Sequence, residues 1–443
     1  PLFSSRSRHT RCGWLSRGLG DVYKRQGLYA LVTSWMTIIL ISVLGCLFIR
    51  LTPSSPGLHP AKGLRSALLL YRVKKLNQIQ RLWTWSITGQ YLRALAGLRF
   101  SRVGASECDL MQNLVPELVT ADSNVFWSHG CFANVLDYGA EHIRLSHLDM
   151  PSNFFSSNNC VAEFGQLPTN FLLGVSTPGN DIQFRRQMNS RLDAPIAVAG
   201  NPPLKIAGSD FEAENRKQQL PGFSLFLTRF LLSDVISIGT LPVAEVLVYT
   251  LYYTALHRFI EQPVLSALLA LVLMEISLVL LSVVAKQVLV GRKWGADHST
   301  SFWSLRHFTY FFAQDCFFAW CRVPLRFLSG TLLSNPVLRW MGCRIGKRTI
   351  VTLPMQTADW NAVNIGDDCV VEGMFQFHTF ENMMLQVKRT DIGDGTSINF
   401  GGMVMGGALI EPGTTVMPLG LVMKGMHLHA AVYQGSPVEP AES

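Results

Sequence analysis

One histidine, His378, stands among residues that could support acid–base chemistry. It lies in the segment Phe-His-Thr-Phe-Glu-Asn (377–382), with Glu381 just after it and Glu372 shortly before it. An imidazole has a pKa near ~6.5, so it can accept a proton from an amine or hydroxyl that attacks a thioester. Either carboxylate could orient the ring and stabilise its positive charge. The segment therefore predicts a catalytic base, His378, supported by Glu381 and Glu372; the alternative is a surface histidine that only forms hydrogen bonds.

The residues after this segment have a period of six, which indicates how it is held. Aliphatic side chains recur at every sixth position, and many positions between them are glycine, proline, aspartate or threonine: Ile392, Ile398, Val404, Ile410, Val416, Val422. A helix would spread such residues around its surface, and a single strand has a period of two. Period six fits a left-handed parallel β-helix of hexapeptide repeats, whose flat walls each turn one aliphatic side chain inward. The same phase continues upstream to Phe377, so we expect His378 at the mouth of a loop extruded from the coil.

The chain carries a second, degenerate version of this pattern. Residues 244 positions apart align over a long stretch without a gap. The matched positions are mostly hydrophobic in both copies: Val119 with Val363, Ile143 with Val387, Leu148 with Ile392. We therefore predict a membrane-anchored β fold with two left-handed parallel β-helix domains of common origin, at 103–208 and 337–438.

The two copies differ where chemistry is expected. The alignment sets an uncharged or shorter residue of the first copy against each candidate of the second: Asn134 against His378, Asp137 against Glu381, Ser128 against Glu372. The first copy therefore has no base with a pKa near neutrality at this place. We expect the first domain to act as a scaffold and the second to be catalytic.

Hydrophobic segments precede and separate these domains. Only 15% of the 443 residues are charged. The run 27–49 predicts a transmembrane helix, and the run 223–290 predicts a transmembrane helical hairpin. Basic residues after each run place both β-helix domains on the cytoplasmic side of an inner or plasma membrane, in a multi-pass protein. These basic residues explain the net charge of +8, and no basic tract with interleaved aromatic residues indicates nucleic-acid binding.

Two further segments have apolar and basic residues at helical spacing. We predict an amphipathic helix on the membrane surface at 65–98, with a helix packed on the soluble domain as the alternative, and an interfacial helix at 303–327. Residues 1–26 have no periodicity and resemble a translated adaptor sequence. We expect them to be a non-native leader; a genuine basic tail is the alternative. The nine scattered cysteines predict reduced, mostly buried thiols.

The remaining histidine pair, His427 and His429, does not predict a metal site. A metal ion would need a third ligand, and His378 is the only other histidine in the second domain. The spacing also differs from that of the carbonic-anhydrase-like zinc centres that a β-helix can carry. Glycine pairs at 401–402 and 406–407 suit coil corners rather than phosphate binding. We therefore expect no metal and no bound cofactor here.

The order of elements and several segments resemble a known family. The order is membrane span, β-helix, membrane hairpin, β-helix, and the segments are GTLLSNPVLRWMGCRIGKR, FHTFEN, DIGDGTSINFGGMV and LGLVMKG. Together they resemble the C-terminal membrane region of non-ribosomal peptide synthetase-like proteins of the ε-poly-lysine synthetase type. The β-helix domains of that family are related to hexapeptide-repeat acyltransferases. The resemblance covers residues 27–443.

This resemblance implies a reaction, a donor and partners. Such domains join an aminoacyl group, held as a phosphopantetheine thioester on a carrier protein, to an amine and so form an amide. The resemblance also implies pseudo-trimeric packing of β-helix domains and a carrier-protein domain upstream in the same chain. This sequence contains no adenylation or carrier motif, so we expect it to be a fragment. Two alternatives are an O- or N-acetyltransferase that uses acyl-coenzyme A, and a non-catalytic membrane scaffold.

Overall fold

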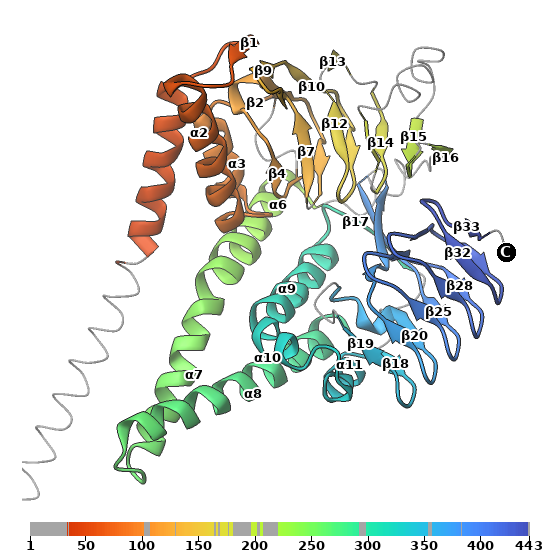
Figure 1. Ribbon diagram of the computed structural model, residues 1–443. Coiled ribbons are helices and arrows are strands. Elements are labelled where there is room, and N and C mark those ends of the chain that lie inside the picture. Colours follow the sequence, from red (N-terminus) through yellow and green to blue (C-terminus); the bar gives the residue numbers. More distant parts are fainter. Residues whose placement is uncertain are drawn as a thin grey trace, which may run out of the picture.

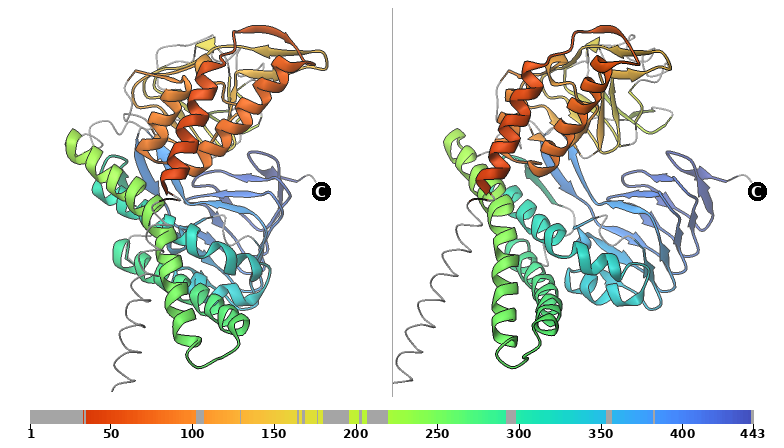
Figure 2. Two further views of the ribbon diagram at one scale, coloured as in Figure 1. Left: turned by 90° about the vertical axis from the view of Figure 1, so that its left-hand side faces the viewer. Right: turned by 60° about the vertical axis from the view of Figure 1, so that its left-hand side comes forward.

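The computed structural model describes residues 33–441, except 34, 102–106, 129, 164, 167–168, 176, 180–195, 202–203, 207–219, 292–297, 353–356 and 382. The predicted leader at 1–26 lies outside the described residues. Figure 1 shows two stacks of short strands and a pair of long helices, α7 and α8, that extends away from them. The two stacks lie next to each other in both views of Figure 2. The two stacks are in direct contact: the Asn201 N–H of the first donates a 2.9 Å hydrogen bond to the Ser436 carbonyl of the second.

Three walls of parallel strands form the C-terminal unit, and successive turns of the chain add one strand to each wall. The first wall is β18 (Arg344–Ile345), β20 (Val363–Ile365), β25 (Thr390–Ile392), β28 (Leu409–Ile410) and β31 (His427–Leu428). The second wall is β19 (Ile350–Val351), β21 (Val370–Val371), β26 (Ser397–Ile398), β29 (Thr415–Val416) and β32 (Val432–Gln434), and antiparallel β33 (Glu439–Pro440) pairs with its last strand. The third wall is β22 (Met374–Gln376), β27 (Met403–Met405) and β30 (Leu421–Val422). The six aliphatic residues of the sequence period lie inside, none more than 3% exposed. This arrangement is compatible with the predicted β-helix.

The N-terminal unit repeats these three walls with larger side chains inside. The first wall consists of β2 (Arg99–Phe100), β5 (Val119–Ala121), β10 (Leu148–Met150) and β13 (Gly165–Gln166). The second consists of β3 (Glu107–Cys108), β6 (Phe126–Trp127), β11 (Phe155–Ser156), β14 (Phe171–Leu173), β15 (Ile196–Ala199) and antiparallel β16 (Leu204–Ile206). The third consists of β4 (Met111–Gln112), β7 (Cys131–Asn134) and β12 (Val161–Glu163). The 244-residue offset superposes β5 on β20, but further along the chain the match shifts by two residues, so that β10 corresponds to β25 and β11 to β26 at an offset of 242. Phe154, which the sequence alignment set against Ile398, takes the place of Thr396 in the structure, and both side chains are fully buried.

An antiparallel hairpin leaves the coil at the same point in both units. In the first unit the hairpin is β8 (Leu136–Tyr138) and β9 (His142–Leu145), and β1 (Gly57–Pro60) pairs with β9 as a third strand. In the second unit it is β23 (His378–Glu381) and β24 (Met384–Val387), and β17 (His298–Ser301) pairs with β24. The second hairpin occupies the break that the sequence period shows before Ile392. It carries His378 at its first position, so the hairpin is the extruded loop that the sequence predicts.

Within the described residues, two helices are long and apolar enough to cross a membrane. One runs from Gly222 to Leu256 and comprises α6 (Gly222–Arg229), the π-helical segment η2 (Phe230–Thr240) and α7 (Leu241–Leu256); the other is α8 (Pro263–Leu289). They form the predicted hairpin, and most of their apolar side chains are exposed. Such surfaces suit lipid rather than water, so these helices indicate membrane association. Of the predicted span 27–49, residues 27–32 and 34 lie outside the described part, and Trp35–Leu51 forms a shorter apolar helix.

The segment predicted as one surface helix at 65–98 is two helices, α2 (Leu64–Leu82) and α3 (Ile87–Ala96). The chain breaks because the Ser86 hydroxyl accepts a 2.8 Å hydrogen bond from the Gly89 N–H and so caps a new helix. Residues on one side of α2 belong to the core of the N-terminal unit: Leu69, Val73, Leu76 and Ile79. The structure therefore agrees with the alternative, a helix packed on the domain.

Helix α9 (Leu305–Trp320) lies between the membrane hairpin and the C-terminal unit (Figure 1). It begins where the Ser304 hydroxyl accepts a hydrogen bond from the His307 N–H over 3.2 Å. The predicted interfacial helix at 303–327 is thus divided into α9 and α10 (Arg322–Phe327), followed by η3 (Leu332–Ser334) and α11 (Asn335–Trp340). One face of α9 is buried against the second unit, and this face brings Tyr310 and Gln314 to the candidate site.

Candidate functional site

His378 forms a hydrogen bond with a buried aspartate that the sequence analysis did not select. Its Nδ1 is paired with Oδ2 of Asp359, whose side chain is 1% exposed. Asp359 immediately precedes the short 3-10 helix η4 (Trp360–Ala362), in the stretch that leads from β19 to β20. An ionised carboxylate can only accept hydrogen bonds, so the proton resides on Nδ1. This tautomer leaves Nε2 of His378 unprotonated and able to act as a base.

Groups from three elements hold the Asp359 carboxylate in place. Gln314 of α9 donates from Nε2 to Oδ1 over 2.8 Å. The Thr357 hydroxyl donates to Oδ2 over 3.4 Å, and the Asp359 N–H donates back to Thr357 Oγ1 over 3.1 Å. Lys286, near the end of α8, donates from its ammonium group to the Ala358 carbonyl and interacts electrostatically with Asp359. A buried carboxylate needs such partners, and these fix the orientation of the His378 ring.

Aromatic side chains surround most of the His378 ring. Tyr310 lies edge-on to it at 6.5 Å and Phe380 at 5.4 Å between ring centres. The His378 side chain is nevertheless 21% exposed. A base in this position can contact a substrate from the open side, while the rings limit access of bulk water to the hydrogen bond with Asp359.

A second histidine, His307 of α9, is completely enclosed behind this site. Its ring lies 4.1 Å from that of Phe302 and 4.5 Å from that of Phe311. Burial holds the pKa of His307 well below its usual range, and the neighbouring His378 and Arg229 lower it further. His307 is therefore neutral at physiological pH and packs as part of the aromatic core.

The two glutamates that the sequence analysis selected occupy different surroundings. Glu372 is half-buried between β21 and β22, and its backbone N–H donates a 2.8 Å hydrogen bond to the Ile398 carbonyl. Glu381 ends β23, and its side chain lies outside the described part of the structure. Asp359 makes the hydrogen bond to the imidazole that was assigned to these glutamates. Their support of His378 stays a prediction.

The N-terminal unit has different residues at the equivalent positions. The 244-residue offset sets Val115 at the place of Asp359, and η1 (Pro116–Leu118) coincides with η4. In the hairpin the offset is 242, so the structural equivalent of His378 is Leu136, the first residue of β8, and not Asn134 as the sequence alignment had it. Val115 is 1% exposed, so an apolar side chain fills the position of the carboxylate. In the sequence alignment Asp359 of the second copy stands against Val115 of the first, and this change from an apolar to a charged residue could have revealed Asp359.

Comparison with known proteins gives one informative similarity. No protein-family model matches the chain. Delta-poly-L-ornithine synthetase of Acinetobacter baumannii (strain AB307-0294) is 24% identical over 403 residues, which cover 84% of this chain and 28% of that protein. The chain is similar to a poly-amino-acid synthetase. It spans less than a third of the length of that relative, whose name is that of an enzyme that forms a polymer of ornithine.

A half-buried carboxylate, Asp315, also links α9 to the long apolar hairpin. The Ser237 hydroxyl of η2 donates to Asp315 Oδ2 over 2.7 Å, and burial raises the pKa of Asp315 to about 6. The ordinary value of about 3.9 applies in the unfolded chain. The folded state therefore binds this proton more tightly, and its contribution to stability is present below pH ~4 and is lost as the pH rises through about 6.

We therefore expect Asp315→Asn to stabilise the protein at pH 8 but not at pH 4. The amide can still accept from Ser237, and the variant avoids the ionised form, so the gain at pH 8 should be about 1–2 kcal/mol after allowance for the partial exposure of this side chain. Thermal unfolding of the detergent-purified protein at both pH values measures the difference. Asp137→Asn, on the exposed strand β8, is the control. An equal effect of Asp315→Asn at both pH values would contradict the assignment.

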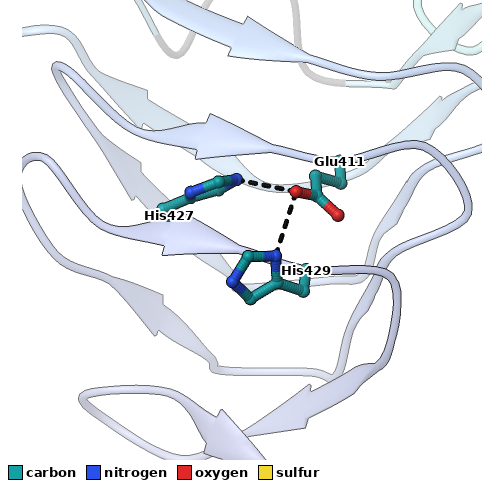
Figure 3. A group of neighbouring side chains, drawn as sticks. All are labelled: Glu411, His427 and His429. Atoms are coloured by element: carbon teal, nitrogen blue, oxygen red, sulfur yellow. Dashed lines mark hydrogen bonds and ion pairs between the residues drawn. The ribbon is translucent and has the colours of Figure 1, made fainter.

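The His427 and His429 pair has a third neighbour that the sequence analysis overlooked. Figure 3 shows both rings directed at the carboxylate of Glu411. His427 Nε2 and His429 Nδ1 each lie 2.9 Å from the same oxygen, Oε1. Glu411 therefore supplies the third group that the sequence analysis did not find beside the two histidines. It lies there because the turn that carries β28 stacks directly under the turn that carries β31.

Proposed function

We propose that the second unit is an aminoacyl transferase that forms an amide from a thioester and an amine, with His378 as the general base. The observation that supports this most directly is the hydrogen bond from Nδ1 of the partly exposed His378 to buried Asp359, which leaves Nε2 available to accept a proton. A base of this kind suits the deprotonation of an attacking amine. The similarity to a protein named as a poly-amino-acid synthetase agrees with amide formation.

In the proposed reaction the amine attacks the thioester carbonyl while Nε2 of His378 takes a proton from the nitrogen. A carbon–nitrogen bond forms and the carbon–sulfur bond breaks. The imidazolium then returns the proton to the departing thiolate, so the products are an amide and a thiol. Asp359 acts as a positioning residue, since it keeps the ring in the productive tautomer and stabilises the imidazolium. Gln314 and Lys286 act through Asp359.

The unequal residues of the two units support this assignment. The second unit carries Asp359 and His378, whereas the first carries Val115 and Leu136 at the structurally equivalent positions. A pair needed only to stabilise the coil would serve both copies equally well. We infer that the first unit is a scaffold, and that both coils are left-handed hexapeptide β-helices.

The setting of the reaction follows from the same proposal. The donor would be a phosphopantetheine thioester on a carrier domain of the same longer chain, and the two long apolar helices would hold the site at the cytoplasmic face of a membrane. Pseudo-trimeric packing with a further β-helix copy upstream would match the hexapeptide acyltransferases. The chain would then be the C-terminal part of a multi-pass synthetase.

The donor can be tested with small thioesters and the detergent-purified chain. Aminoacyl-pantetheine and acetyl-coenzyme A are offered separately with a diamine, and amide product is measured by mass spectrometry beside thiol release. We expect amide from the aminoacyl donor. Product from acetyl-coenzyme A alone would favour an acetyltransferase, and product from neither donor would favour a non-catalytic scaffold.

Within this assay, Asp359→Asn tests the positioning role. The amide side chain can donate to Nδ1 and so favours the wrong tautomer, and kcat should fall at least about tenfold while KM for the donor changes little. Thr357→Val removes the 3.4 Å contact to Oδ2 and the 3.1 Å bond from the Asp359 N–H but keeps the carboxylate itself, so it should have a much smaller effect. Equal rates for Asp359→Asn and the wild type would remove Asp359 from the mechanism.

A further inference from the structure

The cluster of Glu411, His427 and His429 lies outside the site described above, at the opposite end of the first wall from β18. β31 is the last strand of that wall in the described residues, and Glu411 follows β28 in the turn below it. The pairing register aligns Leu409 with His427 and Ile410 with Leu428, so it continues by placing Glu411 against His429. Inward-facing Leu428 separates the two histidines, and both rings therefore stand on the outer face.

The backbone holds these three residues in position. The Glu411 N–H donates to the Leu428 carbonyl over 2.9 Å. The His429 N–H donates to the Tyr433 hydroxyl over 3.1 Å. Three possible ligand atoms, one from each side chain, lie within 4.8 Å of one another. The two nitrogen–oxygen distances of 2.9 Å would have to increase slightly for a metal ion to lie between these atoms, and rotation of the side chains can supply this change.

We propose that Glu411, His427 and His429 bind a divalent transition-metal ion, with zinc as the best match. Two imidazole nitrogens and one carboxylate oxygen are a common zinc donor set with the fourth position left for water. Calcium and magnesium prefer oxygen ligands and are poor matches for two imidazoles. The cluster is exposed, with His429 at 71% and His427 at 46%, so an ion can enter from solvent and keep a water ligand.

The metal would stabilise the C-terminal end of the first wall, where β31 is the last described strand. An edge strand such as β31 has unpaired backbone groups and only one neighbour in its wall. A single ion bound to Glu411 from one turn and to both histidines of the next would join the last two turns on their outer face. The ion would therefore cross-link these two turns, and the proposal does not depend on the transferase reaction.

The test uses the purified chain in detergent after removal of any affinity tag. Zinc chloride is titrated by calorimetry into chelator-treated protein, and hydrogen exchange of the β31 amides is followed with and without zinc. We expect one zinc per chain and slower exchange in β31. His427→Asn and Glu411→Gln should each weaken zinc binding at least about tenfold, and His427→Asn/His429→Asn should abolish it.

Two controls separate this site from other histidines. His147→Asn removes an exposed histidine of the first unit, and it should keep zinc affinity unchanged. All variants should unfold at the wild-type temperature in the presence of chelator, because these side chains lie on the surface. Equal zinc affinity in the wild type and the double variant, or no slowing of β31 exchange with zinc, would overturn the proposal.

Discussion

Replacement of His378 by alanine should lower amide formation from an aminoacyl thioester at least about a hundredfold, because the loss of a positioned general base typically costs 10²–10⁴ in rate. Gln314 and Thr357 still donate to the Asp359 carboxylate when the imidazole is removed, so the fold should remain intact. Thiol release and amide product are measured together, since water can still hydrolyse the thioester slowly. Donor binding should be largely unchanged, and the loss should therefore appear in kcat.

Two comparisons make the His378→Ala result specific. His378→Gln keeps a polar side chain of similar size but supplies no base, so it should be as slow as alanine. His147→Asn removes an exposed histidine of the first unit and should keep the wild-type rate. Added imidazole should restore part of the activity of His378→Ala. If His378→Ala and His378→Gln both turned over at the wild-type rate, the second unit would be a scaffold and the transferase proposal would fail.

Replacement of Phe380 by alanine should destabilise the protein by about 3–5 kcal/mol, the range for loss of a large aromatic side chain from a core. Phe380 lies on β23 and is 5% exposed. Its ring centre is 4.9 Å from that of Phe126 in the first unit and 5.3 Å from that of Phe302. The side chain therefore contributes to the contact between the two coils as well as to the wall of the His378 site.

Phe400→Ala is the matched control for this prediction. Phe400 is in the same unit but is 68% exposed, so its loss should change stability by no more than about 0.5 kcal/mol. Unfolding of both variants by heat and by denaturant gives the difference. Phe380→Leu should recover part of the stability, because it restores apolar volume without the aromatic pairs. Similar stabilities for Phe380→Ala and Phe400→Ala would show that the aromatic cluster does not hold the units together.

The helical segments show how far local patterns predict this protein. The apolar hairpin was predicted well, because hydropathy over some twenty residues is a strong signal. The segments 65–98 and 303–327 were predicted as single helices, although each contains two. The first break has a serine cap, and at the second the fully buried Cys321 stands between α9 and α10 without a side-chain cap. Such local competition between a cap and a continuous helix is poorly visible in periodicity.

The sequence by itself determined the coil, its duplication and the position of His378. A period of six requires each turn to place an aliphatic side chain inward, and this regularity is local, so it can be seen without coordinates. Only the tertiary structure decided that Asp359, rather than Glu372, bonds the imidazole. It also decided that Gln314 of α9 holds that carboxylate and that Glu411 joins His427 and His429. These contacts depend on how turns stack and how α8 and α9 dock, and the spacing of residues along one chain does not specify either.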